Sequence, residues 1–179
     1  MFRKPQLLQL RFHPDPILSQ SSIEVTKEEL PSLRDLIADM GHTMYENDGC
    51  GLAAIQVGVA KRLLVYDVSE DQKDLRALIN PRITFLSKDE ETADEGCLSF
   101  PGLFEPIARA HSARIEALDA KGKPLTLEVE DFLARVLQHE IDHLDGITML
   151  GRMDDELRQS ALREYFGLFE AAPQGVVVH

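Results

Sequence analysis

The sequence predicts an α+β fold in which short antiparallel strands surround a central helix. Three observations carry this prediction. Residues 131–144 have a helical apolar spacing, residues 114–129 have the alternation and central turn of a β-hairpin, and the other strand-like segments are short. The chain has 179 residues and no internal repeat or long linker, so we expect residues 1–179 to form a single domain.

The first half of the chain predicts one helix and two strands. Residues 27–47 keep a helical apolar period, and Thr26 followed by Glu29 is a capping pattern. Residues 61–68 and 78–86 are rich in strand formers. The second strand contains Pro81, which cannot donate to a ladder, so we expect an edge or bulged strand.

The second half predicts a hairpin and two helices. Residues 114–118 and 125–129 flank a turn that contains Asp119 and Gly122. A helix over 131–144 follows, then a C-terminal helix over about 152–171. Residues 172–179 are predicted to be a tail. The acidic segment from Asp89 to Asp94 is interpreted as a solvated loop.

Composition excludes several classes of function. Lys and Arg total 19 against 31 Asp and Glu, giving a net charge of −12. Such a balance argues against direct nucleic-acid binding and against docking on anionic membranes. No apolar run approaches the roughly 20 residues of a membrane span, and the N-terminus is a poor secretory signal. We therefore expect a cytoplasmic protein whose two cysteines form no disulfide framework.

The strongest chemical signal is the sequence His-Glu-Ile-Asp-His at 139–143. On a helix, His139 and His143 share one face, so both imidazoles can reach one metal ion. Glu140 points to an adjacent sector, from which its carboxylate can accept a proton from water. Catalytic metal sites usually have three protein ligands and one open position, so a third ligand is needed.

Three positions are candidates for that third ligand. Extended metalloprotease motifs place a histidine at the position of Met149, so this pattern fails. Glu164 on the next helix corresponds to the downstream glutamate of thermolysin-like proteases, although a solvated acid is the simpler interpretation. Cys97 would supply a thiolate, which binds zinc and ferrous iron strongly. The residue types alone leave Glu164 and Cys97 open.

Three segments, in order and spacing, resemble the signature motifs of peptide deformylases: GCGLAAIQ at 49–56, EGCLS at 95–99 and QHEIDH at 138–143. The resemblance runs from about residue 13 to residue 151 and implies the peptide deformylase fold. It implies that Cys97, His139 and His143 bind one divalent metal ion, with water at the fourth position. Ferrous iron would be the native metal, and Zn²⁺ or Ni²⁺ would substitute.

The same resemblance implies a substrate and catalytic roles. The substrate is the N-formyl-methionyl end of a nascent polypeptide, and the products are formate and a free amino terminus. Glu140 would transfer the proton, while the Gln56 side chain and the Leu98 N–H would stabilise the oxyanion. The predicted substrate-binding residues are Gly49, Gly51, Glu95, Gly96, Phe100, Val136 and Leu137.

Neighbouring residues have alternative interpretations. Glu95 and Arg109 match positions that pair near the groove in relatives, although a plain surface pair is the alternative. Asp142 is predicted to orient a ligand histidine or a nearby arginine, or to be a solvated acid. Cys50 is predicted to be a small apolar wall. Leu133 is a further candidate for the methionine slot.

The chain also departs from the family pattern. Phe104 stands where some relatives have an arginine that contacts the peptide backbone, and the segment after His143 differs. The C-terminal helix carries more acidic than basic residues, so we expect at most a weak ribosome contact. Two alternative functions stay open: a HExxH metalloprotease, and a catalytically silent relative that binds formylated peptides. Loss of Glu140 or Gln56 would mark the silent relative, and both are present.

Overall fold

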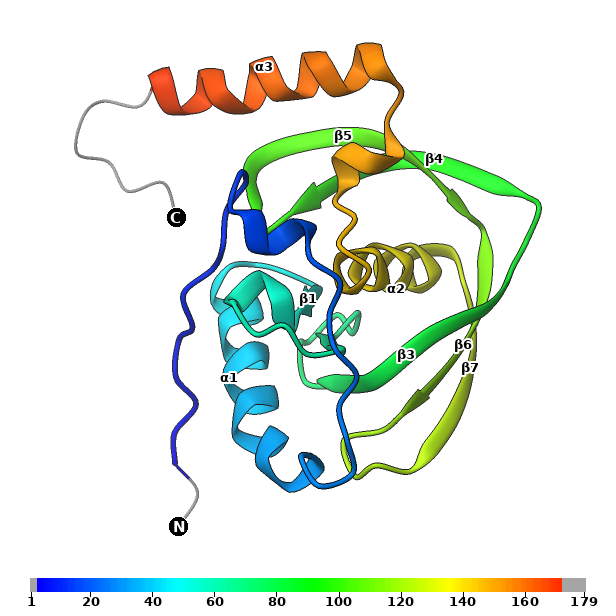
Figure 1. Ribbon diagram of the computed structural model, residues 1–179. Coiled ribbons are helices and arrows are strands. Elements are labelled where there is room, and N and C mark those ends of the chain that lie inside the picture. The colour runs from blue at the N-terminus through cyan, green and yellow to red at the C-terminus, as the bar shows by residue number, and fades with distance from the viewer. Residues whose placement is uncertain (1–2, 172–179) are drawn as a thin grey trace.

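A central helix surrounded by two antiparallel sheets defines the architecture (Figure 1). The structure is a computed structural model that describes residues 3–171, without the side chains of 169–171; the predicted tail lies outside these residues. Helix α2 (Asp131–Leu144) lies at the centre, with α1 (Leu33–Glu46) on one side. Helix α3 (Asp155–Ala171) packs on the second sheet. The predicted α+β class is confirmed.

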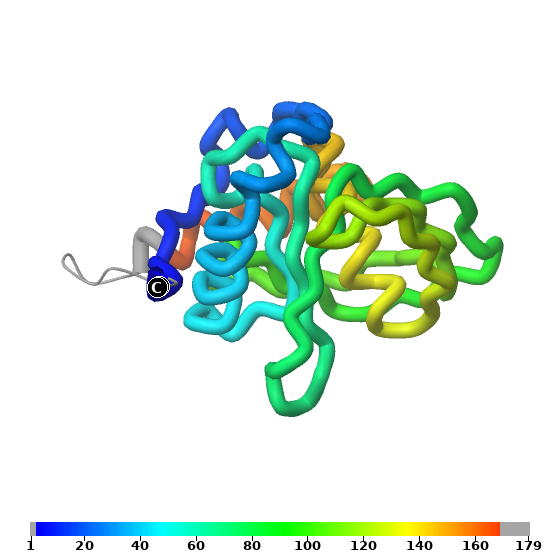
Figure 2. Tube along the Cα trace, turned by 90° about the horizontal axis from the view of Figure 1, so that it is seen from below, coloured from blue at the N-terminus to red at the C-terminus, as the bar shows by residue number. Residues whose placement is uncertain are grey.

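The larger sheet has the strand order β1-β2-β3-β6-β7, and every neighbouring pair is antiparallel. Its strands are β1 (Gly51–Ala53), β2 (Leu63–Tyr66), β3 (Arg76–Leu86), β6 (Ser112–Leu118) and β7 (Pro124–Glu130). The smaller sheet pairs β4 (Glu90–Cys97) with β5 (Phe100–Ala110). Figure 2 shows α1 on one side of β2 and β3, with the β6–β7 hairpin on the other.

The helix and hairpin of the second half are confirmed, because α2 has the predicted bounds and β6 pairs with β7. The first helix begins later than predicted. Leu30–Ser32 form a 3₁₀ turn, and the α-helix starts at Leu33. The cause is Pro31, which lacks an N–H and restricts the residue before it. Thr26 and Glu29 instead close the preceding turn, where the Thr26 N–H donates to Glu29 Oε2 at 2.8 Å.

Strand β3 is bulged as predicted, but it is not an edge strand. It lies between β2 and β6, and its pairing with β6 shifts register between Ile79 and Arg82. Pro81 lies within this irregular stretch. Its missing N–H therefore removes no hydrogen bond from the regular part of the ladder. The Pro81 carbonyl accepts a hydrogen bond from Arg62 Nε at 3.0 Å.

The acidic segment is a strand and not the predicted loop. Residues 90–97 form β4, paired with β5 along its whole length. The side chains of Glu90, Glu91 and Asp94 are exposed, which is common on a sheet edge, where charge discourages pairing with other chains. The strand ends at Cys97, so this missed element carries the predicted thiolate ligand.

Three apolar clusters hold the elements around α2. One joins α2 to the larger sheet through Ile115, Leu137 and Ile141. A second packs α1 against β1 and β2, and the third joins β5 to α3. The segment after His143 contributes Met149 and Leu150 to the third cluster, so its departure from the family pattern still gives a packed core. Within residues 3–171, no helix is long and apolar enough to cross a membrane.

Candidate metal centre and active site

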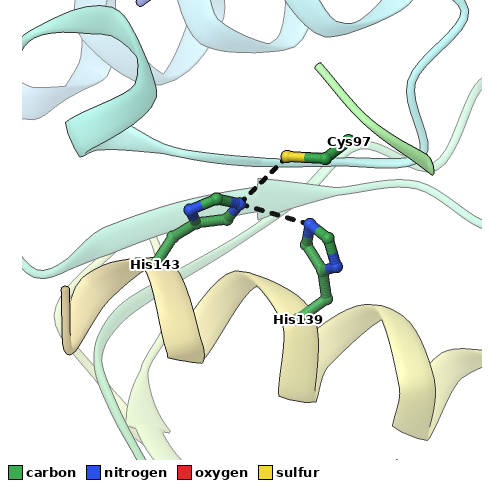
Figure 3. Close-up of side chains that lie close together, drawn as sticks. All are labelled: Cys97, His139 and His143. Carbon is green, nitrogen blue, oxygen red and sulfur yellow. Dashed lines mark hydrogen bonds between the residues drawn. The ribbon is translucent and has the colours of Figure 1, made fainter. Parts of the chain in front are cut away.

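Helix α2 and the end of β4 bring three potential metal ligands together (Figure 3). His139 and His143 lie one turn apart on α2, with their Nε2 atoms 3.2 Å from each other. Cys97 Sγ lies 3.2 Å from His143 Nε2. Both histidines are buried, and the three donor atoms all lie within 4.8 Å of one another.

This donor set fits a divalent transition metal. One sulfur and two imidazole nitrogens converge on the same small volume, and such ligands suit zinc and ferrous iron. Glu164, the alternative third ligand, lies exposed on α3. The geometry therefore favours Cys97 over Glu164.

A second group of potential ligands, which the sequence analysis missed, lies on the surface. Glu91, His111 and Asp131 bring their ligand atoms within 4.8 Å of one another. His111 Nδ1 lies 3.4 Å from Asp131 Oδ1, and both side chains are largely solvent-exposed. This surface group is separate from the buried cluster around Cys97.

A buried ion network fixes the orientation of His139. Glu95 Oε2 lies 2.8 Å from His139 Nδ1, and Arg109 Nε donates to Glu95 Oε1 at 2.9 Å. Arg135 Nη1 donates to the same oxygen at 2.8 Å. Burial would raise the pKa of Glu95, but the hydrogen bonds from His139 and Arg109 hold it at about 2. The carboxylate is thus charged, and it sets the ring direction as residues behind metal ligands commonly do.

Asp142 forms ion pairs with two arginines, which agrees with the prediction that it orients a nearby arginine. Arg152 Nε donates to its Oδ2 at 2.8 Å, and Arg109 Nη1 donates to the same carboxylate. The solvated-acid interpretation is wrong because Asp142 is 4% exposed. The Glu95–Arg109 pair is likewise buried, so the surface-pair alternative is also wrong. Sequence reasoning missed Arg135, although a cation one turn before His139 on a buried helix face is a usable signal.

Removing Arg109 should destabilise the fold strongly. In Arg109→Met, Glu95 and Asp142 each lose a buried partner, so we expect the free energy of unfolding to fall by about 3–5 kcal/mol. Urea denaturation measures this change. Arg114→Met is the matched control, because the Arg114–Glu128 pair is exposed and should contribute about 1 kcal/mol or less. Equal losses in the two variants would contradict the account of the buried network.

Glu140 lies beside the ligands with an unused oxygen. The side chain is buried, and its Oε2 has no hydrogen-bond partner among the residues that the structure describes. Burial raises the pKa of its carboxyl to about 7. A Cβ at Gly51 would lie 2.6 Å from Glu140 Oε1, so only glycine at position 51 leaves room for this carboxylate. The arrangement suits a group that accepts and releases a proton near neutral pH.

Gln56 is held with its amide near the ligand thiol. Its Oε1 accepts the Ala53 N–H at 2.9 Å, and its Nε2 donates to Ser99 Oγ at 3.1 Å. The same Nε2 lies 3.6 Å from Cys97 Sγ. Leu98 directly follows the thiol and is half-buried. The two predicted oxyanion donors therefore come from two separate segments, one from the 3₁₀ turn Ala54–Val57 and one from the chain directly after β4.

Cys97, Leu98, His139 and Glu140 line one cavity of about 350 Å³, whereas Gln56 and His143 lie behind its lining residues. Six of the seven predicted substrate-binding residues line it: Gly49, Gly51, Glu95, Gly96, Phe100 and Val136. Cys50 lines it as well, as its predicted role as a wall requires. Leu137 instead lies fully buried in the core cluster, because it points from α2 toward the larger sheet. Leu133 also packs against that cluster.

Sequence reasoning missed one wall of this cavity. Leu10 and Phe12 line it from the N-terminal segment, which runs past α1 (Figure 1). Backbone bonds fix the segment there, since the Arg11 N–H donates to the Gln56 carbonyl at 2.7 Å. The His13 N–H donates to the Ser99 carbonyl at 2.9 Å. An extended chain without periodicity gives no sequence signal for such a contact.

Comparisons with known proteins agree with this geometry. Residues 7–159 match the sequence model of the family described as polypeptide deformylase. A peptide deformylase of Natranaerobius thermophilus is 43% identical and covers 84% of this chain and 94% of its own length. Peptide deformylase 1 of Burkholderia multivorans is 40% identical over 93% of this chain and 91% of its own length.

Solved structures are similar over nearly the whole chain. The crystal structure of peptide deformylase from Ehrlichia chaffeensis has a TM-score of 0.84 and 36% identity, covering 94% of this chain and 99% of the other. The same enzyme in complex with actinonin has a TM-score of 0.84 and 38% identity, covering 93% and 99%.

Proposed function

Because this chain belongs to the polypeptide deformylase family, we propose which of its residues carry out the metal-dependent removal of the N-formyl group from nascent polypeptides. One observation supports the assignment most strongly. The donors of Cys97, His139 and His143 converge beside Glu140, a buried carboxylate with an unpartnered oxygen, and Cys97, His139 and Glu140 line a cavity together with apolar side chains.

Cys97, His139 and His143 would hold one divalent ion. We infer from the family resemblance that ferrous iron is the native metal. Zn²⁺ or Ni²⁺ would substitute, since a thiolate and two imidazoles accept all three. When bound, the ion supplies a Lewis acid that makes water nucleophilic near pH 7. Glu95 keeps the His139 ring turned toward the cluster by accepting from Nδ1.

Glu140 moves the proton in this proposal. Its buried carboxylate takes a proton from the attacking water and later gives it to the leaving amine of the methionine. General acid–base catalysis of this kind contributes roughly 10²–10⁴-fold to the rate. The pKa of about 7 supports both halves of this transfer.

Gln56 and Leu98 stabilise the developing negative charge. The Gln56 Nε2 amide and the Leu98 backbone N–H donate to the oxyanion that forms when water attacks the formyl carbon. The hydrogen bonds of Gln56 to Ala53 and Ser99 support this role, because they hold the amide in place before the reaction. Losing one such donor typically lowers the rate by about 10²–10³.

The substrate enters as a neutral, formylated chain end. Its methionine side chain lies against Phe100 and Val136, while Gly49, Gly51 and Gly96 line the cavity beside the peptide backbone. A neutral end needs no cationic site, which is consistent with the net charge of −12. We further propose that the chain acts in the cytoplasm as a single domain and that any contact with the ribosome is weak.

Product analysis distinguishes this function from the two alternatives. We expect formyl-Met-Ala-Ser to yield formate and intact Met-Ala-Ser. A metalloprotease would cut the Met-Ala or Ala-Ser bond, and a silent relative would bind the peptide and leave it unchanged. Chromatography of the peptide together with an enzymatic formate assay separates the three results.

A further inference from the structure

Three side chains near the start of α2 bring metal-binding atoms together away from the active site. They are Glu91 on β4, His111 between β5 and β6, and Asp131 in the first turn of α2, and we call them the surface group. His111 Nδ1 is 3.4 Å from Asp131 Oδ1. Nitrogen and oxygen ligands lie about 2.0–2.2 Å from zinc, so two ligands of a tetrahedral zinc ion are about 3.4 Å apart. The spacing of His111 and Asp131 is therefore that of two ligands of one ion.

The third ligand and the backbone beneath all three fit the same ion. The ligand atom of Glu91 lies within 4.8 Å of the other two, and this side chain is exposed and free to turn toward an ion. The His111 N–H donates to the Asp89 carbonyl at 2.8 Å, and the Asp131 N–H donates to the His111 carbonyl at 2.9 Å. Arg135 Nη2 donates to the Glu91 carbonyl at 2.6 Å. Binding would therefore order side chains only, on a backbone that is already held in place.

The charge of the surface group matches a divalent cation. Glu91 and Asp131 are carboxylates, and a neutral imidazole adds no charge to them. Two arginines lie near the group: Arg109 is the cross-strand partner of Glu91, and Arg135 follows Asp131 by one helical turn. The guanidinium groups of both arginines bind Glu95 instead. A divalent cation would therefore replace the repulsion between two neighbouring carboxylates by attraction.

We propose that Glu91, His111 and Asp131 form a second metal site, which binds a divalent transition-metal ion such as Zn²⁺. An imidazole with two carboxylates suits Zn²⁺ or Ni²⁺, whereas Mg²⁺ and Ca²⁺ take oxygen ligands. The ion would join β4, the chain between β5 and β6, and α2, which only the folded chain brings together. It would therefore stabilise the fold by binding the native state alone. The inference does not depend on the proposed function.

The test counts ions per chain. The chain is first loaded with one Zn²⁺, which the buried cluster around Cys97 takes, and is then titrated with further Zn²⁺ in equilibrium dialysis. We expect a second ion to bind more weakly than the first, and we expect His111→Ala to bind the first ion only. Formate release should be the same in both proteins, because the surface group lies apart from Cys97, His139 and His143.

Conservative variants and a matched control identify the ligands. Glu91→Gln and Asp131→Asn should each weaken the second ion by more than about 10-fold, the lower range of what loss of a residue behind a metal ligand costs. His42→Ala is the control, because His42 is a partly exposed histidine whose Nδ1 lies 3.9 Å from one carboxylate, that of Glu46. It should still bind two ions. Excess Mg²⁺ should not displace the second Zn²⁺.

Stability gives a second readout. Zn²⁺ beyond the first equivalent should raise the urea midpoint of the unchanged chain and of His42→Ala, and it should leave the midpoint of His111→Ala where it was. Circular dichroism verifies that each variant is folded before the titration.

Three results would overturn the second site. They are a chain that binds one Zn²⁺ until the free ion reaches about millimolar concentration, a second ion that His111→Ala still holds, and a second ion that Mg²⁺ displaces as well as Zn²⁺ does. Each result leaves the deformylase assignment intact, because formate release is measured on the first ion. Conversely, a chain that binds the second ion but releases no formate would uphold this inference and overturn the proposed function.

Discussion

Glu140→Ala should lower kcat for formate release by about 10²–10⁴-fold while the protein keeps its metal. The loss follows because no other described residue places an unpartnered carboxylate oxygen beside the ligands. Metal retention follows because Cys97, His139 and His143 form the cluster without Glu140. Steady-state kinetics and elemental analysis of the same sample measure both quantities.

The matched control for this variant is Glu156→Ala, which removes an exposed carboxylate from α3. We expect it to leave kcat and metal content unchanged. A Glu140→Ala protein with near-normal turnover would remove Glu140 from proton transfer. A variant that had lost its metal would instead show that Glu140 acts by supporting the ligands.

Cys97→Ser should reduce the metal content or change which metal is held. A serine hydroxyl is a weaker ligand for zinc and ferrous iron than a thiolate, so the two histidines would be left with a poor third partner. Elemental analysis after purification without oxygen, followed by titration with Zn²⁺ and Fe²⁺, measures the effect. Unchanged metal content and rate would transfer the third-ligand role to another residue.

Cys50→Ser provides the control for the loss of a thiol near the site. Cys50 lines the cavity but lies outside the ligand cluster. Burial and the charge of Glu140 raise the pKa of its thiol to about 11, so this side chain stays neutral and is a poor metal ligand. We therefore expect Cys50→Ser to bind metal as the unchanged protein does.

The part of the site on α2 was predictable because a helix has a fixed period. The spacing of His139 and His143 defines their common face, and the apolar residues around them define the bounds of the helix. The hairpin was predictable for the same reason, since alternation and a turn motif are local signals. The resemblance to a family then identified Cys97 as the third ligand. No local sequence pattern predicts that this residue lies near the helix.

The rest depends on contacts between distant segments. Strand β4 was not predicted because its acidic side chains are typical of a solvated loop and give no sign of its pairing with β5. This pairing places Cys97 beside His143. Pro81 predicted an edge or a bulged strand, and only the pairing with β6 shows that it is a central strand with a bulge. The cavity wall formed by the N-terminal segment and the arginines that bind Glu95 likewise depend on tertiary packing. Such packing gives no periodic pattern in the sequence.

The most direct test measures formate release against metal content. The protein is purified without oxygen, stripped of metal and reloaded with Fe²⁺ or Zn²⁺ in steps, and each sample is assayed with formyl-Met-Ala-Ser. We predict that no formate forms without metal and that the rate rises with bound metal and levels off at about one ion per chain. A filled site that releases no formate would contradict the assignment of Cys97, His139, His143 and Glu140 to deformylation.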